Sequence, residues 1–423
     1  MCSTPSAKSE AAPEPPKPKK LWDSILTSTP VVLTVVATLL AGLSTSEMSR
    51  AQYYRALAAQ HQSKAGDQWG FFQAKRTRGG STEMTVELLR AQNILVPVSG
   101  ETIAEFAARL PRDLDRIAKV SERLLGTLST AKTETGANSP RDLLEKLVQT
   151  AQQKATEARA LEIKLTEALA RPEVREALAY LNTTELPEAV RETVGNAKID
   201  EAHRAILARK TEEETESLMA EIREEELRQA VNTAEENARA FDEKGKPVDS
   251  LIASVAQLIK EATALTGVVH HIVERVNGAL ADLAASDSGP VRVAASDTAA
   301  NEMRNLAAAL VRADNALTKS ADEMNQSFVA ARRDFTARRY EREARDNQEI
   351  AGVYEIQVRK SSGESERHRK RSQLFFVGML IAQAGVTIAT FALAMRQRSV
   401  LWVLATIAGL AAIAFSGYVY LFT

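Results

Sequence analysis

The chain has 423 residues, of which 44% are hydrophobic and 26% are charged, and its formal net charge is -1. This near balance of charge gives no reason to expect nucleic acid or another strongly charged partner. A single cysteine, Cys2, excludes an intramolecular disulfide and a cysteine-based zinc cluster. Aromatic residues make up only 5% of the chain, and glycine and proline are sparse, so the predicted fold is all-α.

The N-terminal region predicts a disordered tail followed by a membrane helix. Residues 1–27 begin with a proline-rich, polar segment that buries too little apolar surface to offset the entropy of ordering. Residues 28–46 contain an uncharged stretch from Pro30 to Ser46, which is long enough for a first transmembrane helix. A cleaved signal peptide is the alternative, but no cleavage motif of small residues follows Leu40 and the helical pattern continues.

The next segment, residues 47–80, predicts a membrane-proximal helix that carries most of its aromatic residues in one motif, DQWGFFQAK. We expect Gly79 and Gly80 to end this helix, because paired glycines favour helix termination.

Residues 81–240 predict a helical region with two apolar seams at alternating spacings of three and four. Pro111 is expected to kink or restart the first helix, and Ser139 and Pro140 form an N-cap and first-turn pair for the second, after a loop at 133–138. The seam positions are Ile103, Ala107, Leu110, Leu114, Ile117, Ser121, Leu124 and Leu128 in the first helix, and Leu144, Leu147, Ala151, Lys154, Ala158, Leu161, Leu165 and Ala168 in the second.

Residues 241–345 predict a long antiparallel helical hairpin or coiled coil, in which a turn at 286–290 joins two helices. The first seam has strict 4-3 spacing and the second resumes it after one slip of four residues. Their positions are Leu251, Val255, Leu258, Ala262, Leu265, Val269, Ile272, Val276, Ala279 and Leu283, then Met303, Leu306, Leu310, Ala313, Leu317, Ala321, Met324, Phe328, Ala331 and Phe335.

The C-terminal region predicts a membrane hairpin. A basic juxtamembrane segment, 346–373, precedes a transmembrane helix at 374–395, a basic turn at 396–399 and a third transmembrane helix at 400–422. Trp402, Tyr418 and Tyr420 are placed like interfacial anchors. Small residues four apart favour close helix contact, namely Gly378 with Ala382, Gly385 with Ala389, and Ala405 with Gly409.

The motif Asp67, Gln68, Trp69, Gly70, Phe71, Phe72, Gln73, Ala74, Lys75 resembles the signature of a bacterial membrane-protein family described as domain of unknown function 4337. The resemblance covers residues 25–80 and 345–423, and implies that the residues between them are a coiled-coil insertion. It also implies a multi-pass protein of the bacterial inner membrane. It supplies no catalytic or cofactor-binding residues.

On a helix, Trp69, Phe72 and Gln73 share one face, whereas Gln68 and Lys75 are expected to lie away from it. Packing against a neighbouring helix or the membrane surface is the simpler interpretation of this motif, and a ligand or partner site is the alternative.

No histidine marks a catalytic or metal site. His270, His271 and Glu274 are interpreted as solvated, because adjacent histidines on a helix cannot both face one ion. His61, His203 and His368 stand alone, and no nucleophile, phosphate-loop or dinucleotide motif is present. We therefore expect a protein that is not an enzyme and has no cofactor and no small-molecule substrate.

Basic residues directly before the second membrane segment predict contact with anionic lipid headgroups rather than nucleic acid. These residues are Arg367, Arg369, Lys370 and Arg371. A further run, Arg332, Arg333, Arg338, Arg339, Arg342 and Arg345, is expected to pair with the acidic stretch at 209–228.

The leading hypothesis is a membrane-anchored coiled-coil scaffold or tether that self-associates or holds another helical protein. A sensor that passes a conformational change along its helices is the alternative, and a channel or transporter is a third, weaker possibility. Lys17, Lys19 and Lys20 favour a cytoplasmic N-terminus, although the basic cluster before Leu374 argues for the opposite orientation.

Overall fold

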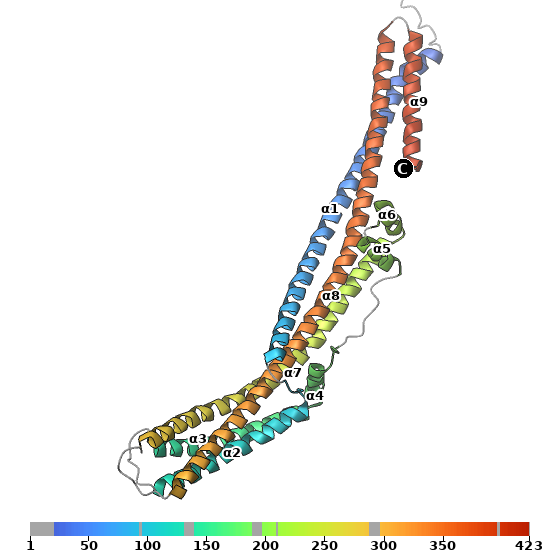
Figure 1. Ribbon diagram of the computed structural model, residues 1–423. Helices are drawn as coiled ribbons and strands as arrows, with labels where there is room; N and C mark the ends of the chain where they lie inside the picture. Colours follow the sequence, from blue (N-terminus) through green and yellow to red (C-terminus); the bar gives the residue numbers. More distant parts are fainter. Residues whose placement is uncertain are drawn as a thin grey trace, which may run out of the picture. The chain divides into compact units, whose positions relative to one another are not determined.

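The computed structural model describes residues 21–92, 95–130, 139–187, 197–208, 210–286, 297–395 and 398–422. Within these ranges every regular element is a helix, which confirms the predicted all-α fold (Figure 1). The predicted loop at 133–138 and the turn at 287–290 lie outside the described residues, as do residues 1–20 of the predicted tail.

The long helices are fewer and more continuous than the sequence pattern predicts. Helix α1 (Leu21–Gln92) begins inside the range predicted as a tail and passes through Gly79 and Gly80 without ending. Helix α7 (Glu224–Ser286) contains Pro247, and α8 (Asp297–Ala394) carries the predicted second membrane segment at its C-terminal end. Helix α9 (Arg398–Phe422) carries the third.

Among the residues that the structure describes, four helices are long and apolar enough to cross a membrane by length and composition, whereas three were predicted from the sequence. The additional one is α7, over Glu224–Asp282. Its apolar residues include Val255, Val269 and Val276, which are fully buried in a cluster of helix-packing side chains. A bundle core and a membrane segment both require apolar side chains, which explains why composition alone groups α7 with the membrane segments.

The chain divides into two compact units. Unit 1 comprises residues 1–64, 197–227 and 353–423, and unit 2 comprises residues 65–196 and 228–352. Helices α5 (Ala197–Leu207) and α6 (Glu212–Ala220) belong to unit 1. Helices α2 (Gly100–Thr130), α3 (Pro140–Ala170) and α4 (Pro172–Asn182) belong to unit 2.

Unit 2 is built on helices α2, α3, α7 and α8, whose seams meet in one hydrophobic cluster. Helices α2 and α3 lie side by side (Figure 1). All eight predicted seam positions of α2 are buried, and α2 continues through Pro111. The Ser139 hydroxyl accepts a hydrogen bond from the Asp142 amide, which confirms the predicted N-cap of α3.

Helices α7 and α8 run antiparallel in unit 2, because Asp242 pairs with Arg339 and His270 pairs with Asp314. The buried line of α7 lies one residue beyond several of its predicted seam positions. Ile252 and Ile259 are each 1% exposed, whereas Leu251 and Leu258 are only partly buried.

Helix α1 has a second kind of seam, which apolar periodicity does not detect. Every seventh residue from position 37 is buried or half-buried, and so is the residue three positions after each of these. We call these two lines together the α1 seam. The first line is Ala37, Ser44, Ala51, Ala58, Ala65, Phe72, Gly79 and Val86; the second is Leu40, Glu47, Tyr54, His61, Gln68, Lys75, Thr82 and Leu89.

In unit 1 the α1 seam contacts α8 through short polar bonds. The Ser44 hydroxyl donates to the Ser372 carbonyl at 3.0 Å, and the Ser372 hydroxyl donates to the Ser44 carbonyl at 2.8 Å. The Ser365 hydroxyl donates to the Ala51 carbonyl at 2.8 Å. Such side-chain-to-backbone bonds require the two helices to lie very close, which small residues permit.

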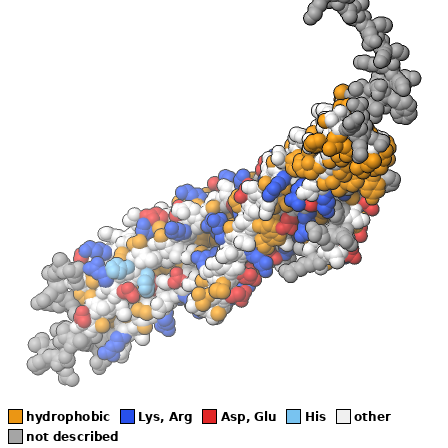
Figure 2. All heavy atoms as spheres, turned by 90° about the horizontal axis from the view of Figure 1, so that it is seen from above, with side chains coloured by type: hydrophobic (Ala, Val, Ile, Leu, Met, Phe, Trp, Pro, Cys, Tyr) orange, Lys and Arg blue, Asp and Glu red, His pale blue; other side chains and the backbone are white. Residues whose placement is uncertain are grey.

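The apolar segments of α1, α8 and α9 also pack together in unit 1. All six small residues predicted for close contact, from Gly378 to Gly409, are buried. A Cβ atom on Gly385 would lie 3.5 Å from Leu33 of α1 and 3.3 Å from Ala408 of α9. Outward-facing side chains of the same segments stay exposed, including Val31, Leu39 and Ile407. Figure 2 shows such a gathering of hydrophobic side chains on one part of the surface.

Trp402 differs from its predicted role as an interfacial anchor. It is 7% exposed and belongs to the cluster that contains Leu33 and Ala389. Tyr418 and Tyr420 are 60% and 75% exposed, as an anchor position requires.

Candidate functional site

The family motif lies on α1 in unit 2, and its inward face agrees only in part with the predicted one, since Trp69 and Phe72 are partly buried but Gln73 is not. Gln68, Phe72 and Lys75 are partly buried, on the side of the helix that forms the α1 seam. Gln73 is exposed, as are Asp67 and Phe71. The prediction that Gln68 and Lys75 lie away from the packing face is therefore wrong, because polar and small residues form this interface.

The aromatic residues of the motif contact each other. The rings of Trp69 and Phe72 meet edge to face, with 5.3 Å between their centroids. The guanidinium of Arg76 lies over the Phe72 ring at 5.9 Å. These contacts favour the packing interpretation of the motif, since aromatic pairs in this geometry stabilise helix surfaces.

Lys75 joins the motif to α8. Its ammonium group forms an ion pair with Glu343 and lies 5.2 Å from the centre of the Tyr340 ring. One turn further along α1, Gly79 is buried, and a Cβ atom there would lie 3.5 Å from the Ala337 carbonyl oxygen. The glycine thus lets α1 approach the α8 backbone, which explains its place inside the helix.

A cluster of charged residues links α1, α7 and α8 at this level; we call it the three-helix ion cluster. Its centre is Arg339 of α8, which is 16% exposed and pairs with Glu343 at 2.8 Å, with Asp242 at 3.0 Å and with Asp249. The backbone of α7 leaves room for the guanidinium at Gly245, where a Cβ atom would lie 3.4 Å from it.

Local cations favour the ionised form of Asp242 in this cluster. The hydrogen bond from Lys246 to Asp242, assisted by the charges of Lys246, Arg339 and Lys75, lowers the pKa of the Asp242 carboxyl despite its partial burial. Glu343 accepts from Lys75 and Arg339 and is only 12% exposed. A guanidinium with several fixed acceptors holds the helices in one register.

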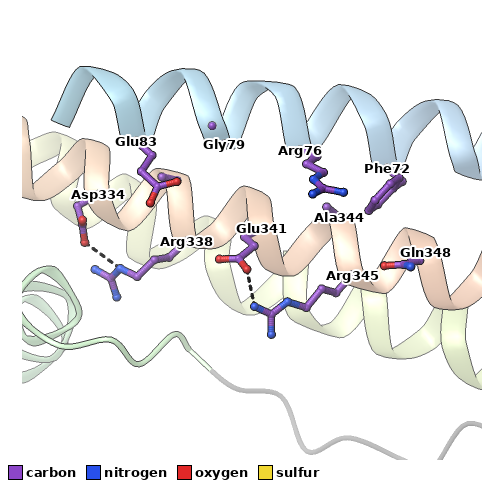
Figure 3. Close-up of a pocket in the computed structure, with 12 residues that line it drawn as sticks. Phe72, Arg76, Gly79, Glu83, Asp334, Arg338, Glu341, Ala344, Arg345 and Gln348 are labelled. Atoms are coloured by element: carbon purple, nitrogen blue, oxygen red, sulfur yellow. Dashed lines mark hydrogen bonds and ion pairs between the residues drawn. The ribbon is translucent and has the colours of Figure 1, made fainter. Parts of the chain in front are cut away.

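A groove runs beside the motif between α1 and α8 (Figure 3). Its volume is about 480 Å³. Small residues line part of it, with Gly79 and Gly80 on α1 and Ala337 and Ala344 on α8, and charged residues line the rest. Figure 3 shows Arg338 bound to Asp334 and Arg345 bound to Glu341, while Arg76 and Glu83 come from α1.

Members of the arginine run of α8 have partners within unit 2. Arg338 donates to the backbone carbonyls of Tyr180, Thr183 and Glu185, beside its ion pair with Asp334. Arg342 pairs with the buried carboxylate of Asp346 at 3.3 Å. These arginines thus bind residues of unit 2.

Two histidines that sequence reasoning set aside are engaged in helix pairing. In unit 1, His368 binds Glu47 at 2.5 Å and stacks on Tyr54, with 5.5 Å between ring centroids. In unit 2, His270 binds Asp314 at 2.7 Å, so its interpretation as solvated is wrong. The partner carboxylates lie far away in sequence, and no local motif could have indicated them.

The predicted lipid-headgroup residues lie on α8 immediately before Leu374. Arg367, Arg369 and Lys370 are exposed, and Arg371 is partly buried. Arg367 and Arg369 lie 3.3 Å from Glu364 and Glu366, so part of their charge is balanced within the helix. Among the residues that the structure describes, no three His, Cys, Asp or Glu side chains gather as a metal site would require.

The three-helix ion cluster generates a stability prediction. Arg339→Ala removes the cation shared by Glu343, Asp242 and Asp249, which should cost about 1.5–3 kcal/mol, because Lys75 still pairs with Glu343 and Lys246 with Asp242. Arg345→Ala is the control, because Arg345 and Glu341 are 65% and 63% exposed and such pairs are worth at most about 1 kcal/mol. Urea unfolding of the detergent-solubilised full chain, followed by circular dichroism, measures both. Equal destabilisation by the two variants would contradict the assignment.

Comparisons with known proteins agree with the motif. Residues 22–171 match the model of the family Domain of unknown function (DUF4337), while no curated protein and no solved structure matches. The matched segment differs from the predicted one, because it continues without a break through α2 and α3 and does not include the C-terminal hairpin. The family domain therefore includes α2 and α3, which the motif resemblance alone had assigned to an insertion. The likeness to this family is therefore shown for residues 22–171 of the chain.

Proposed function

We propose that this protein is a membrane-anchored helical scaffold without catalytic activity. The observation that supports it best is the pairing of α1 with α8. Each of these helices includes a stretch long and apolar enough to cross a membrane, and in unit 1 their contacts continue beyond those stretches, from Ser44 with Ser372 to His61 with Tyr354. Pairing of this kind fixes the polar continuations of α1 and α8 to their apolar stretches.

The ionisable side chains support a structural role. His368 and Glu47, His270 and Asp314, and Lys75 and Glu343 are engaged with each other between helices. A general acid or base needs access to a substrate proton, whereas the carboxylates of these pairs are at most 13% exposed and are already bound to a partner on another helix.

We propose that three of the four apolar helices cross the bacterial inner membrane, and that the fourth, α7, does not. The seam of α7 packs against helices with polar outer faces, whereas the apolar segments of α1, α8 and α9 pack with each other in the clusters around Leu33 and Leu40. We place the N-terminus in the cytoplasm on the basis of Lys17, Lys19 and Lys20, and the basic residues before Leu374 at anionic headgroups.

The groove beside the family motif is the surface that we assign to a partner helix, from a second copy or from another helical protein. A floor of small residues with charged walls suits a helix that carries small and polar side chains. The sensor hypothesis remains a second candidate, because α1 and α8 pass without a break from an apolar segment to polar ones.

Membrane anchoring is tested by alkaline extraction of deletion variants. The chain lacking residues 1–46 should stay in the membrane fraction, because the segments in α8 and α9 each have enough uncharged residues to cross the hydrocarbon layer. The chain lacking residues 374–423 should stay as well, through α1. Soluble protein from the first deletion would refute the hairpin. Soluble protein from the second, shortened at its N-terminus, would favour a cleaved signal peptide.

The scaffold role is tested by cross-linking in native membranes. A photo-reactive residue in place of Glu83 should yield cross-links to a second chain, and Gly80→Trp should reduce them by filling the groove. Gly66→Trp is the matched control, since Gly66 also lies on α1, has no neighbouring atom within 4 Å of the position that a Cβ atom would take, and does not line the groove. If no inter-chain cross-link forms, or if both tryptophans act alike, this groove is not a docking surface.

A further inference from the structure

A polar pair interrupts the apolar seam between α7 and α8. His270 Nδ1 lies 2.7 Å from Asp314 Oδ2, and the Asp314 side chain is only 3% exposed. His270 is more accessible, with 35% of its side chain exposed, and its Nε2 atom lies 3.5 Å from Glu274. The aspartate is therefore buried in the core, whereas the histidine bonded to it is partly exposed to solvent.

The neighbours of this pair on both helices are mainly apolar. One turn away on α7, Thr266 is 2% exposed and its hydroxyl donates to the Thr263 carbonyl of its own helix at 2.7 Å. On α8, Thr318 lies one turn beyond Asp314. Buried apolar residues of the same seam lie on either side in sequence, namely Leu265, Val269, Val273, Leu310, Leu317 and Ala321.

Asp314 depends on His270 for its ionisation. Its other oxygen, Oδ1, is buried and has no hydrogen-bond partner among the described residues. The Thr318 hydroxyl is likewise buried and has no hydrogen-bond partner among them. A buried carboxylate with one partner is costly when that partner is neutral, and much less so when the partner carries a positive charge.

The surrounding charges favour a protonated histidine. The hydrogen bond with Asp314 raises the pKa of the His270 imidazole, and the charges of Asp314, Glu274 on α7 and Asp322 on α8 raise it further against the effect of burial. Burial raises the pKa of the Asp314 carboxyl, and the bond to His270 opposes this. The two groups therefore share their ionisation and respond together to pH.

We propose that His270 and Asp314 form a proton-binding site that latches α7 to α8 in unit 2. With a proton on His270, the pair is an ion pair in an apolar seam. Without it, a carboxylate remains buried beside a neutral ring, and the two helices separate locally more often. The ligand of this site is a proton, which reaches it from solvent at the partly exposed His270 ring.

The direction of the pH dependence follows from the raised pKa of His270. The stabilisation is fully present below the ordinary histidine pKa of 6.5, and it is lost as pH rises through the higher pKa of the folded protein. Each unit by which the pKa is raised corresponds to about a tenfold change in the local opening equilibrium.

Hydrogen exchange of the full chain in lipid nanodiscs tests the latch, with wild type, His270→Gln and His271→Gln compared at each pH. At about pH 6, His270→Gln should speed exchange in peptides covering 262–276 and 310–321 by about three- to tenfold over wild type, and the ratio should approach one by about pH 9. His271 is exposed, so His271→Gln should exchange like wild type at both pH values. Equal effects of the two variants, or a ratio that does not change with pH, would overturn the proposal.

Asp314→Asn separates the latch from a simple packing role, because it keeps the shape of the side chain and removes its charge. We expect the histidine signal that disappears in His270→Gln to titrate at a lower pH in Asp314→Asn than in wild type, as followed by nuclear magnetic resonance of labelled histidines. An unchanged titration of that signal would overturn the proposal even if the exchange rates differ.

Discussion

The close approach of α1 to α8 is the constraint on which the other features depend. It is made possible by small residues at most positions of a seven-residue repeat, such as Ala51 and Ala58 in unit 1 and Ala65 and Gly79 in unit 2. Larger side chains would hold the two backbones apart and remove the bonds from Ser44 and Ser365. The contact of Lys75 with Glu343 and the groove depend on α1 also lying close to α8 beside Gly79.

Polar groups rather than apolar ones distinguish one register of these helices from another. A seam of alanines is nearly the same after a shift of one heptad, so it gives little preference for a single alignment. The pairs Glu47 with His368, Lys75 with Glu343 and His270 with Asp314 each fit only one alignment. Their burial costs free energy, which their mutual attraction largely offsets, and a misaligned pair would leave a buried charge unpaired.

The sequence was informative where helices bury large apolar side chains. The seam of α2 was predicted completely, because Ile103, Leu114 and Leu124 stand out at 3-4 spacing from a polar background. In α7 the same reasoning identified the helix but placed several seam positions one residue too early, since Leu258 and Ile259 are both apolar and only packing shows which one is central.

The candidate site was predicted less well, for a physical reason. Apolar periodicity cannot detect a seam of alanine, serine and glycine flanked by glutamate, histidine, glutamine and lysine, so Gln68 and Lys75 were assigned to the wrong face. His270 was interpreted as solvated because its partner, Asp314, lies 44 residues away. The heptad spacing of small residues along α1 was present in the sequence and is the signal that could have revealed the seam.

Disulfide formation between α1 and α8 tests the central claim most directly. In a full-length chain with Cys2 replaced by serine, the pair Ser44→Cys and Ser372→Cys should cross-link readily in membranes, because the two hydroxyl oxygens lie 3.3 Å apart. The pair Ser46→Cys and Ser372→Cys is the control, since Ser46 is exposed on another face of α1. Preferential cross-linking of the first pair is the result that close pairing of α1 with α8 predicts, and cross-linking of neither pair, or of both equally, would contradict it.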